Sequence, residues 1–487
     1  MTTRVETTAV PDMSLHPLAA AAGSSAEHDD YARERVPDHA KRGAGAVLSV
    51  LVGFVTAFFF VLVGGLFLNM AGAASTWIAL AISFVMLIVL TLIVSGTASR
   101  EGLTAELLTR GCGFGAVGSV LTTMIYAGTF VIYAGTEGQI LARSIDQIWD
   151  LPDKLWFIIV ACIFLPMAWN GISSMTRILT WTVPVYLVLL VWAIVNAWNL
   201  NGGMPDGMFT AMPEGAVGGV VGVIAIMAAL SGTVGINPFE ASDYNRFIRA
   251  DEFRRKAFLT VVLPYALLFF GAMPLGMYFT LITKSIDPSI YFIGLIGLVP
   301  GVALAWVSQI RVNLTNIHVS SVAYASASDI VGMKVLGRRF WVLAVTAATI
   351  ALMWFDVLGN LYVFLQWTGI FLLSWVACVV ADITVVRRLL KLVTGPIEYR
   401  NSHIRRYNPV GICALLAGTA TASLIWLYST DPLWNGLSAY IGFVVAFVLH
   451  VMLAILTKCR TYFSDPTDPR LTVNRNAFAR EEGKSHA

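Results

Sequence analysis

The chain has 487 residues, of which 57% are hydrophobic and 13% charged, with a formal net charge of +3 at pH 7. Polar side chains are too few to cover a water-soluble globule of this size, so the composition excludes an ordinary soluble enzyme or binding domain. Apolar runs of roughly 20 residues, the length that crosses a hydrocarbon core, recur along nearly the whole chain. The sequence therefore predicts an all-α polytopic membrane protein.

Residues 1–42 are polar, and the first apolar run begins only near Gly43, so the chain lacks the short basic start and cleavage site of a signal peptide. We expect this tail to be disordered and cytoplasmic. The later runs predict about twelve membrane helices, near 44–70, 75–96, 115–142, 155–172, 177–198, 216–238, 257–283, 292–326, 340–356, 358–386, 409–429 and 436–457.

Basic residues give these helices an orientation. With an even number of helices both termini share one side, and nearly all of the 32 lysines and arginines fall on that side. The opposite side receives Arg143, Lys154 and Lys284. Because positive loops stay in the cytoplasm, we expect both termini there and the protein in the inner (cytoplasmic) membrane.

Two of the expected helices carry residues that can interrupt them. Gly64-Gly65 lies in the first helix, Gly218-Gly219 begins the sixth, and Asn237-Pro238 closes the sixth. Interrupted helices at corresponding positions of two halves are typical of inverted-repeat transporters, in which unwound backbone binds substrate and ion. Ordinary close packing of Gly and Pro in membrane helices is the alternative.

Glu137 is an ionisable residue within an apolar run. A charge costs about 2.5–3.5 kcal/mol at the centre of a membrane, so such residues usually line a cavity or pathway. Tyr133 lies four residues earlier on the same helical face, and Gln139 follows in the same stretch. An aromatic ring beside a carboxylate suits a flat heterocycle with N–H donors. Alternatively, Glu137 lies near the outer interface or pairs with a buried arginine.

The eighth expected helix is too polar to face lipid. Gln309, Asn313 and Asn316 fall on one face, and Ser308 and Arg311 on an adjacent one. Amide side chains offer both a donor and an acceptor, which matches the mixed edge of a nucleobase. Hydrogen bonds between helices are the alternative role, and for Arg311 we expect either a buried acid as partner or a link to the cytoplasmic vestibule.

Motifs for other chemistry are missing from the sequence. The five cysteines are scattered without a CxxC pair, which argues against a disulfide framework, a zinc site or an iron–sulfur site. No HExxH motif or Walker loop occurs. We expect no enzyme activity and no cofactor other than a coupling ion, H⁺ or Na⁺.

Two segments resemble motifs of nucleobase:cation symporter family one, the cytosine, purine, allantoin and hydantoin permeases. Asp243, Tyr244 and Arg246 follow the sixth helix as the family's Asp-aromatic-Ser/Thr-Arg-aromatic signature does. The segment 110–119 resembles the family's Arg-x-x-Phe-Gly-x-x-Gly stretch, with one extra residue between Arg and Phe. The twelve-helix layout agrees over roughly residues 40 to 460.

The resemblance implies a five-plus-five inverted repeat of the LeuT type, with two further helices and alternating access around a midplane site. It divides the chain into a first repeat at 43–198, an inverted second repeat at 199–388, a cytoplasmic linker at 389–408, two last helices at 409–458 and a cytoplasmic tail at 459–487.

The resemblance also implies a binding site. In the family the substrate stacks on aromatic residues of helices three and six and hydrogen-bonds to amides of helices three and eight. Helix six has no aromatic residue between Gly215 and Pro238, so stacking from helix one is an alternative. The expected substrate-binding residues are Tyr133, Glu137, Gln139, Ser231, Gly232, Thr233, Gln309, Asn313 and Phe58.

The expected cation site departs from the family as well. Members that use sodium bind it with helix-one carbonyls and a pair of helix-eight hydroxyls, which places a candidate sodium site at Ala57 and Ser308. The second hydroxyl is replaced by Gln309. With Glu137 as a protonatable group nearby, we expect proton coupling rather than sodium coupling.

These features predict a secondary active transporter, a cation symporter that imports a nucleobase or related small heterocycle. A symporter of the same fold for an amino acid or a quaternary osmolyte is the alternative. Its partners are a small-molecule substrate and the lipid bilayer, with no nucleic acid, and the sequence leaves the oligomeric state open.

Overall fold

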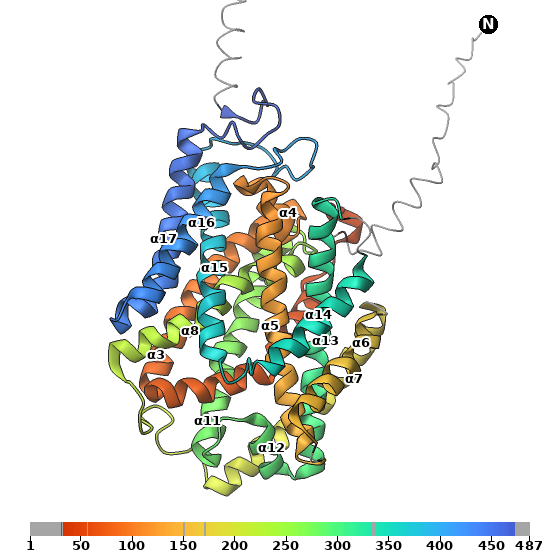
Figure 1. The fold of residues 1–487 in the computed structure, drawn as a ribbon, viewed down its shortest axis with the longest axis vertical. Coiled ribbons are helices and arrows are strands. Elements are labelled where there is room, and N and C mark those ends of the chain that lie inside the picture. Colours follow the sequence, from red (N-terminus) through yellow and green to blue (C-terminus); the bar gives the residue numbers. More distant parts are fainter. Residues whose placement is uncertain are drawn as a thin grey trace, which may run out of the picture.

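The computed structural model describes residues 31, 33–55, 57–149, 151–169, 172–333 and 337–472. In this part of the chain the structure is a bundle of long helices whose only β-pairing is two isolated bridges, Val393 with Leu471 and Ile404 with Phe463 (Figure 1). Eight helices among the described residues are long and apolar enough to cross a membrane. The chain is therefore a multi-pass membrane protein, while the count of twelve stays a prediction.

The structure divides the first two expected helices at residues other than those predicted. Helix one is broken at Ala57, which has an extended backbone, between α2 (Ala44–Val55) and α3 (Phe58–Glu101). Helices one and two are then joined within α3 at Gly72, whose φ of 75° is a conformation that glycine adopts without strain.

The expected interruption at Gly64-Gly65 is wrong. Both glycines lie inside α3, and a Cβ on Gly64 would overlap the Met273 carbonyl group. Glycine is needed here because the backbones of α3 and α11 (Met273–Thr283) approach closely, which is the packing alternative stated above.

Three further helices of the first half follow the expected runs to within about five residues, namely α5 (Gly118–Asp146), α6 (Asp153–Trp169) and α7 (Ile172–Asn201). α8 (Gly219–Asn245) extends beyond its expected end at 238, and α4 (Ala105–Thr109) and η2 (Arg110–Phe114) lie where no helix was expected. Helix six was expected to be interrupted, and this is also wrong, because α8 runs without a break through Asn237 and Pro238.

The second half begins with a segmented helix and ends with two regular ones. The elements are α9 (Ala250–Ala257), η3 (Phe258–Val262), α10 (Leu263–Leu267), η4 (Leu268–Ala272), α11, α12 (Pro288–Ile296), α13 (Leu298–Ile330), α14 (Arg338–Trp354), α15 (Leu361–Ala381), η5 (Asp382–Leu389), α16 (Pro409–Tyr428) and α17 (Pro432–Leu456). The stretch 340–386 forms two helices, as expected. The single helix expected at 292–326 is instead divided at Gly297.

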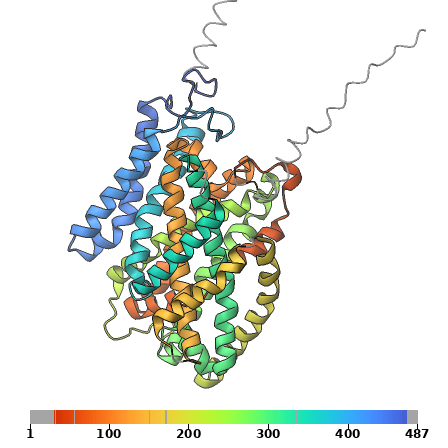
Figure 2. The ribbon, with the colours of Figure 1, turned by 45° about the vertical axis from the view of Figure 1, so that its right-hand side comes forward.

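Five helices form the centre of the bundle. α3 packs extensively on α8, α5 on α13, and α15 on α8. α16 and α17 pack on each other and on α15, at one edge of the bundle (Figures 1 and 2). Since α8 lies between α3 and α15, most residues of its second half are buried.

Both ends of the described chain lie at the same end of the bundle (Figures 1 and 2). We call this end, with residues 31–43, 389–408 and 457–472, the tail face. Ionic contacts hold its segments together: Lys41 Nζ donates to the carbonyl oxygens of Ser99 and Arg246, and Glu398 binds both Arg400 and Arg470. Two ends on one face agree with an even number of membrane crossings.

Candidate functional site

A buried cavity lies where helix one is divided, between α2, α3, α5, α8, α10 and α13. Its volume is about 50 Å³, room for a few water molecules. It is lined by Leu51, Ala57, Phe59, Phe60, Phe130, Tyr133, Glu137, Thr233, Ile236, Asn237, Glu240, Pro264, Tyr265, Leu268, Val312 and Asn316.

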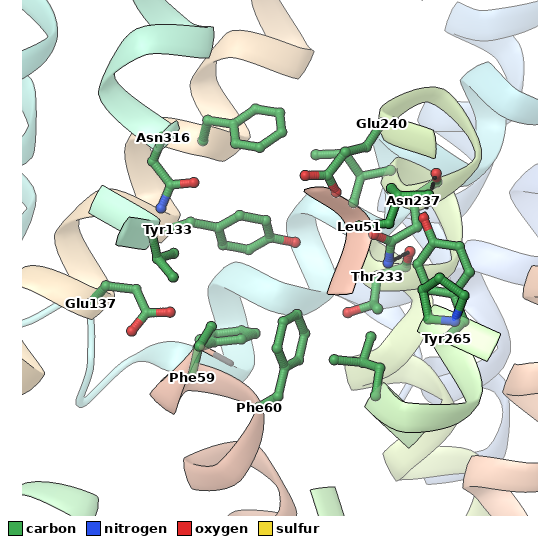
Figure 3. Close-up of a pocket in the computed structure, with 16 residues that line it drawn as sticks. Leu51, Phe59, Phe60, Tyr133, Glu137, Thr233, Asn237, Glu240, Tyr265 and Asn316 are labelled. Carbon is green, nitrogen blue, oxygen red and sulfur yellow. Dashed lines mark hydrogen bonds between the residues drawn. The ribbon is translucent and has the colours of Figure 1, made fainter. Parts of the chain in front are cut away.

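Aromatic rings form much of the wall. The Tyr133 ring lies across the cavity, with Phe59 and Phe60 beside it (Figure 3). Its centroid is 5.4 Å from that of Phe59 and 6.1 Å from that of Phe130. The rings meet at angles of 49° and 84°, so Tyr133 is held by edge contacts with its neighbours. A flat ligand can therefore pack against aromatic faces here.

Glu137 presents a carboxylate with spare hydrogen-bonding capacity. It is 1% exposed, and the Gln309 amide and the Phe59 backbone N–H face it. That N–H belongs to the first turn of α3, where unpaired N–H groups and the helix dipole favour negative charge. Neither Glu137 Oε2 nor Gln309 Nε2 has a hydrogen-bond partner among the described residues. The carboxylate can therefore accept a hydrogen bond from a ligand.

The eighth expected helix supplies one amide to the wall. Asn316 lines the cavity, and its Nδ2 has no hydrogen-bond partner in the described part of the chain. Asn313, the amide expected from the sequence, instead donates from Nδ2 to the Gln309 carbonyl oxygen one turn earlier, at 3.2 Å. The two asparagines are three residues apart, so sequence spacing alone could not tell which of them reaches the cavity.

The second half of α8 supplies a polar face of which sequence reasoning found Thr233 alone. Thr233, Asn237 and Glu240 follow the spacing of one helical face and all line the cavity. Asn237 Nδ2 donates to the Thr233 carbonyl oxygen at 2.8 Å, and the Tyr265 hydroxyl donates to the Asn237 carbonyl oxygen at 3.1 Å. The signal was Glu240, which lies two residues beyond the expected helix end at 238 and on the Thr233 face.

Glu240 is the second carboxylate of the cavity. It is 9% exposed, and the hydroxyls of Tyr133 and Tyr265 lie within electrostatic range of it. Glu137 and Glu240 lie on different sides of the cavity, with the Tyr133 ring between them (Figure 3). The lining includes two carboxylates and, among the described residues, no lysine, arginine or histidine.

Six of the expected substrate-binding residues lie outside the lining, including Gln309 and Asn313 of α13, which are described above. Ser231 Oγ donates to the Ala228 carbonyl oxygen, and Gly232 packs on Thr368 of α15. Phe58 is fully buried and packs on Phe292, with ring centroids 4.9 Å apart.

Another of these residues, Gln139, ties α5 to the turn between α14 and α15. Its Nε2 donates to the Met353 carbonyl oxygen at 3.2 Å, and its Oε1 accepts from the Leu358 N–H at 2.7 Å. Both ends of the amide are therefore engaged in the fold.

The candidate sodium site stays a prediction. Ala57 lines the cavity at the break of helix one, and Ser308 is fully buried in α13. Among the described residues no three His, Cys, Asp or Glu side chains are grouped so that they could hold a metal ion.

The motif after helix six joins the bundle to the tail face. Asp243 accepts hydrogen bonds from the Ala105 N–H at the start of α4 and from the Tyr126 hydroxyl of α5, at 2.8 and 3.1 Å. Arg246 Nη1 donates to the Tyr31 carbonyl oxygen at 3.1 Å, and its guanidinium lies over the Phe247 ring. These residues connect three helices with the N-terminal segment and do not line the cavity.

A divided first helix, a buried cavity beside the break and a multi-pass bundle define the class: this is the fold of a membrane transporter. The structure is similar to the inward-facing conformation of Mhp1, with a TM-score of 0.70 and 15% identity over 88% of this chain and 95% of that one. It is also similar to a closed conformation of Mhp1, a nucleobase-cation-symport-1 family transporter, with bromovinylhydantoin bound, with a TM-score of 0.67, 15% identity, and 90% and 98% of the two chains covered.

A Na⁺-coupled sialic acid symporter in a substrate-bound outward-open state shares the fold, with a TM-score of 0.57 and 12% identity over 88% of this chain and 92% of that one. These neighbours are transporters of the LeuT fold, which confirms the predicted fold class and agrees with the expectation that the chain is no enzyme. No family model and no curated protein matches the sequence.

Proposed function

We propose that this protein is a secondary active transporter, a cation symporter of the nucleobase:cation symporter type, which imports a nucleobase or related small heterocycle by alternating access. It lies in the cytoplasmic membrane with both termini in the cytoplasm. Support comes from the fold shared with Mhp1 and from the two sequence motifs.

One observation carries the choice of substrate class: a carboxylate oxygen and an amide N–H₂ that have no hydrogen-bond partner among the described residues line a cavity walled by aromatic rings. Glu137 Oε2 accepts from a ring N–H, and Asn316 Nδ2 donates to a ring nitrogen or carbonyl oxygen. Tyr133 and Phe59 contact the ring faces. A heterocycle needs more space than the cavity now has, so its walls must move for the ring to enter, which alternating access provides.

Proton coupling is favoured over sodium coupling. Glu137 lies between the substrate cavity and the first turn of α3, so one proton on its carboxylate changes both the charge of the cavity and the contact with helix one. The helix-eight hydroxyl pair expected for sodium is incomplete, with Gln309 after Ser308. Sodium-stimulated uptake at a clamped pH gradient would contradict this part of the proposal.

The test is uptake into proteoliposomes that contain the purified full chain. Radiolabelled cytosine, uracil, hypoxanthine, allantoin and hydantoin are offered one at a time, with and without an inward proton gradient. Saturable uptake of one member, accelerated by the gradient, is the expected result. If none is carried, and an amino acid or a quaternary osmolyte is, the substrate class is wrong and only the fold remains.

A further inference from the structure

We propose that the transported heterocycle is a cation, a protonated or quaternary aromatic ring, and that Glu240 binds its charge. This inference rests on the proposed function, because it assigns the substrate class of the same cavity. It goes beyond that function because a neutral nucleobase would need no second carboxylate.

The first step is the charge of the cavity. Glu137 and Glu240 are 1% and 9% exposed, and the lining contains no positively charged side chain among the described residues. An uncompensated buried carboxylate is costly, so in an occluded transporter each of the two must either bind a proton or lie beside a cation. A proton on Glu137 and a substrate cation at Glu240 would meet that requirement together.

The second step is the surroundings of the two carboxylates. Glu137 faces hydrogen-bond donors, the Gln309 amide and the Phe59 N–H. Glu240 has no hydrogen bond or ion pair to a donor side chain in the described part of the chain, and its charged neighbour is another acid, Asp243. The Asp243 carboxylate is already engaged by Ala105 and Tyr126. Negative charge is thus least compensated at Glu240.

The third step is the aromatic wall next to Glu240. Tyr133 and Tyr265 both lie within electrostatic range of its carboxylate, and Phe60 faces the same space (Figure 3). Aromatic faces attract cations, most strongly where water is excluded. A ring that carries its own positive charge is attracted both by the carboxylate and by the aromatic faces. A neutral ring interacts favourably with the aromatic faces alone.

Cationic side chains in the surrounding helices are directed elsewhere. Arg311 of α13 lies beside Tyr186, and its Nη2 is next to Gly53 of α2. Arg246 lies over Phe247 and binds Tyr31 at the tail face. Neither residue lines the cavity.

The test compares ligands that differ only in charge. Nicotinamide and 1-methylnicotinamide form one pair, and 1-methylimidazole and 1,3-dimethylimidazolium form a second, smaller pair. Binding to the purified full chain is measured by isothermal titration calorimetry, and choline is included as a cation without a ring. We expect the cation of at least one pair to bind more than tenfold tighter than its neutral partner.

A variant then tests whether Glu240 is the residue that binds the positive charge of the ligand. Glu240→Gln should weaken binding of the preferred cation by about 30-fold or more, the effect of removing one member of a buried charge pair, and should leave the neutral ring unchanged. Asp251→Asn is the matched control, because this exposed acid lies on α9, away from the cavity lining, and forms an ion pair with Arg255 four residues on. The comparison of ligands on the unmodified protein stands even if Glu240→Gln does not fold.

The other outcomes separate this inference from the proposed function. Equal or tighter binding of the neutral rings, together with uptake of a neutral base, overturns the inference and leaves the proposed function intact. Binding of choline but of no ring overturns both. A cation preference that survives in Glu240→Gln overturns the role of Glu240.

Discussion

The Tyr133 ring centroid lies 5.4 Å from that of Phe59, so the middle of α5 meets the first turn of α3 at the wall of the cavity. Two residues that are 74 positions apart in the sequence thereby share one aromatic surface. Any movement of the first turn of α3 relative to α5 changes this surface, which connects the binding of a flat ligand with the conformation of the transporter.

Tyr133→Ala should weaken substrate binding by roughly 1–3 kcal/mol, because it removes the ring on which a heterocycle would stack. Tyr133→Phe keeps the ring and removes only the hydroxyl near Glu240, so it should lose much less affinity. Titration calorimetry on both purified variants measures the difference. Unchanged affinity in Tyr133→Ala would leave this residue with a packing role alone.

Glu137→Gln should fold normally and lose the acceleration of uptake by an inward proton gradient. Glutamine has the same shape and can still face the Phe59 N–H, but it cannot take up a proton. Uptake of the substrate found in the panel is measured at several external pH values, with Asp251→Asn as the control. A pH profile identical to that of the unmodified protein would remove Glu137 from the coupling mechanism.

Asp243→Ala should lower the free energy of unfolding by about 1–3 kcal/mol, since it leaves the Ala105 N–H and the Tyr126 hydroxyl without their acceptor. Tyr126→Phe removes one of the two contacts and should cost about 1 kcal/mol. Thermal unfolding in detergent, monitored by tryptophan fluorescence, shows which of the two variants loses more stability. A larger loss for Tyr126→Phe would contradict the assignment.

Glu398 at the tail face predicts a dependence of stability on acid. Burial raises the pKa of its carboxyl, but hydrogen bonds from Arg400 and Arg470 outweigh this and hold the pKa well below its usual value. A lowered folded-state pKa means that the contribution is complete above the unfolded pKa, about 4.3, and is lost as the pH falls through the folded pKa. The unmodified protein should therefore be more stable than Glu398→Gln at pH 7, with the difference shrinking below about pH 4. If the stability of the two proteins changed in parallel with pH across this range, Glu398 would not be the source of the acid dependence.

Gly276→Ala should destabilise the protein by about 1–3 kcal/mol, because a Cβ there would overlap the Val61 carbonyl group of α3. Gly271 in η4 is the control in the same segmented helix, since a Cβ there would meet nothing within 4 Å. Gly271→Ala should be neutral or slightly stabilising. Equal unfolding midpoints for the two variants would show that α3 and α11 can move apart enough to accommodate the Cβ.

The sequence predicted the fold well and the site in part. Long apolar runs report membrane helices directly, so most helix positions agree within a few residues. Tyr133 and Glu137 were found because a carboxylate in an apolar run is rare. Their roles in binding stay predictions until measured.

What the sequence could not reveal has identifiable physical causes. Proline was taken as the end of helix six, but α8 continues past Pro238, with Tyr265 binding the Asn237 carbonyl oxygen, and so carries Glu240 to the cavity. Glycine pairs occur both at helix breaks and at close helix crossings, so Gly64-Gly65 was ambiguous. Asn313 and Asn316 differ by less than one turn, and only packing decides which faces inward.

Because helix one is divided at Ala57, α2 is a short helix that can tilt about the break. Its twelve residues give a length of about 18 Å, and Leu51, inside this segment, forms part of the cavity wall. A tilt of about 10° about the break would displace the far end of α2 by about 3 Å. Because α3 is fixed against α8 and α11 while α2 packs on α10 and η3, such a tilt changes one wall of the cavity and leaves the aromatic surface of Phe59 and Tyr133 in place.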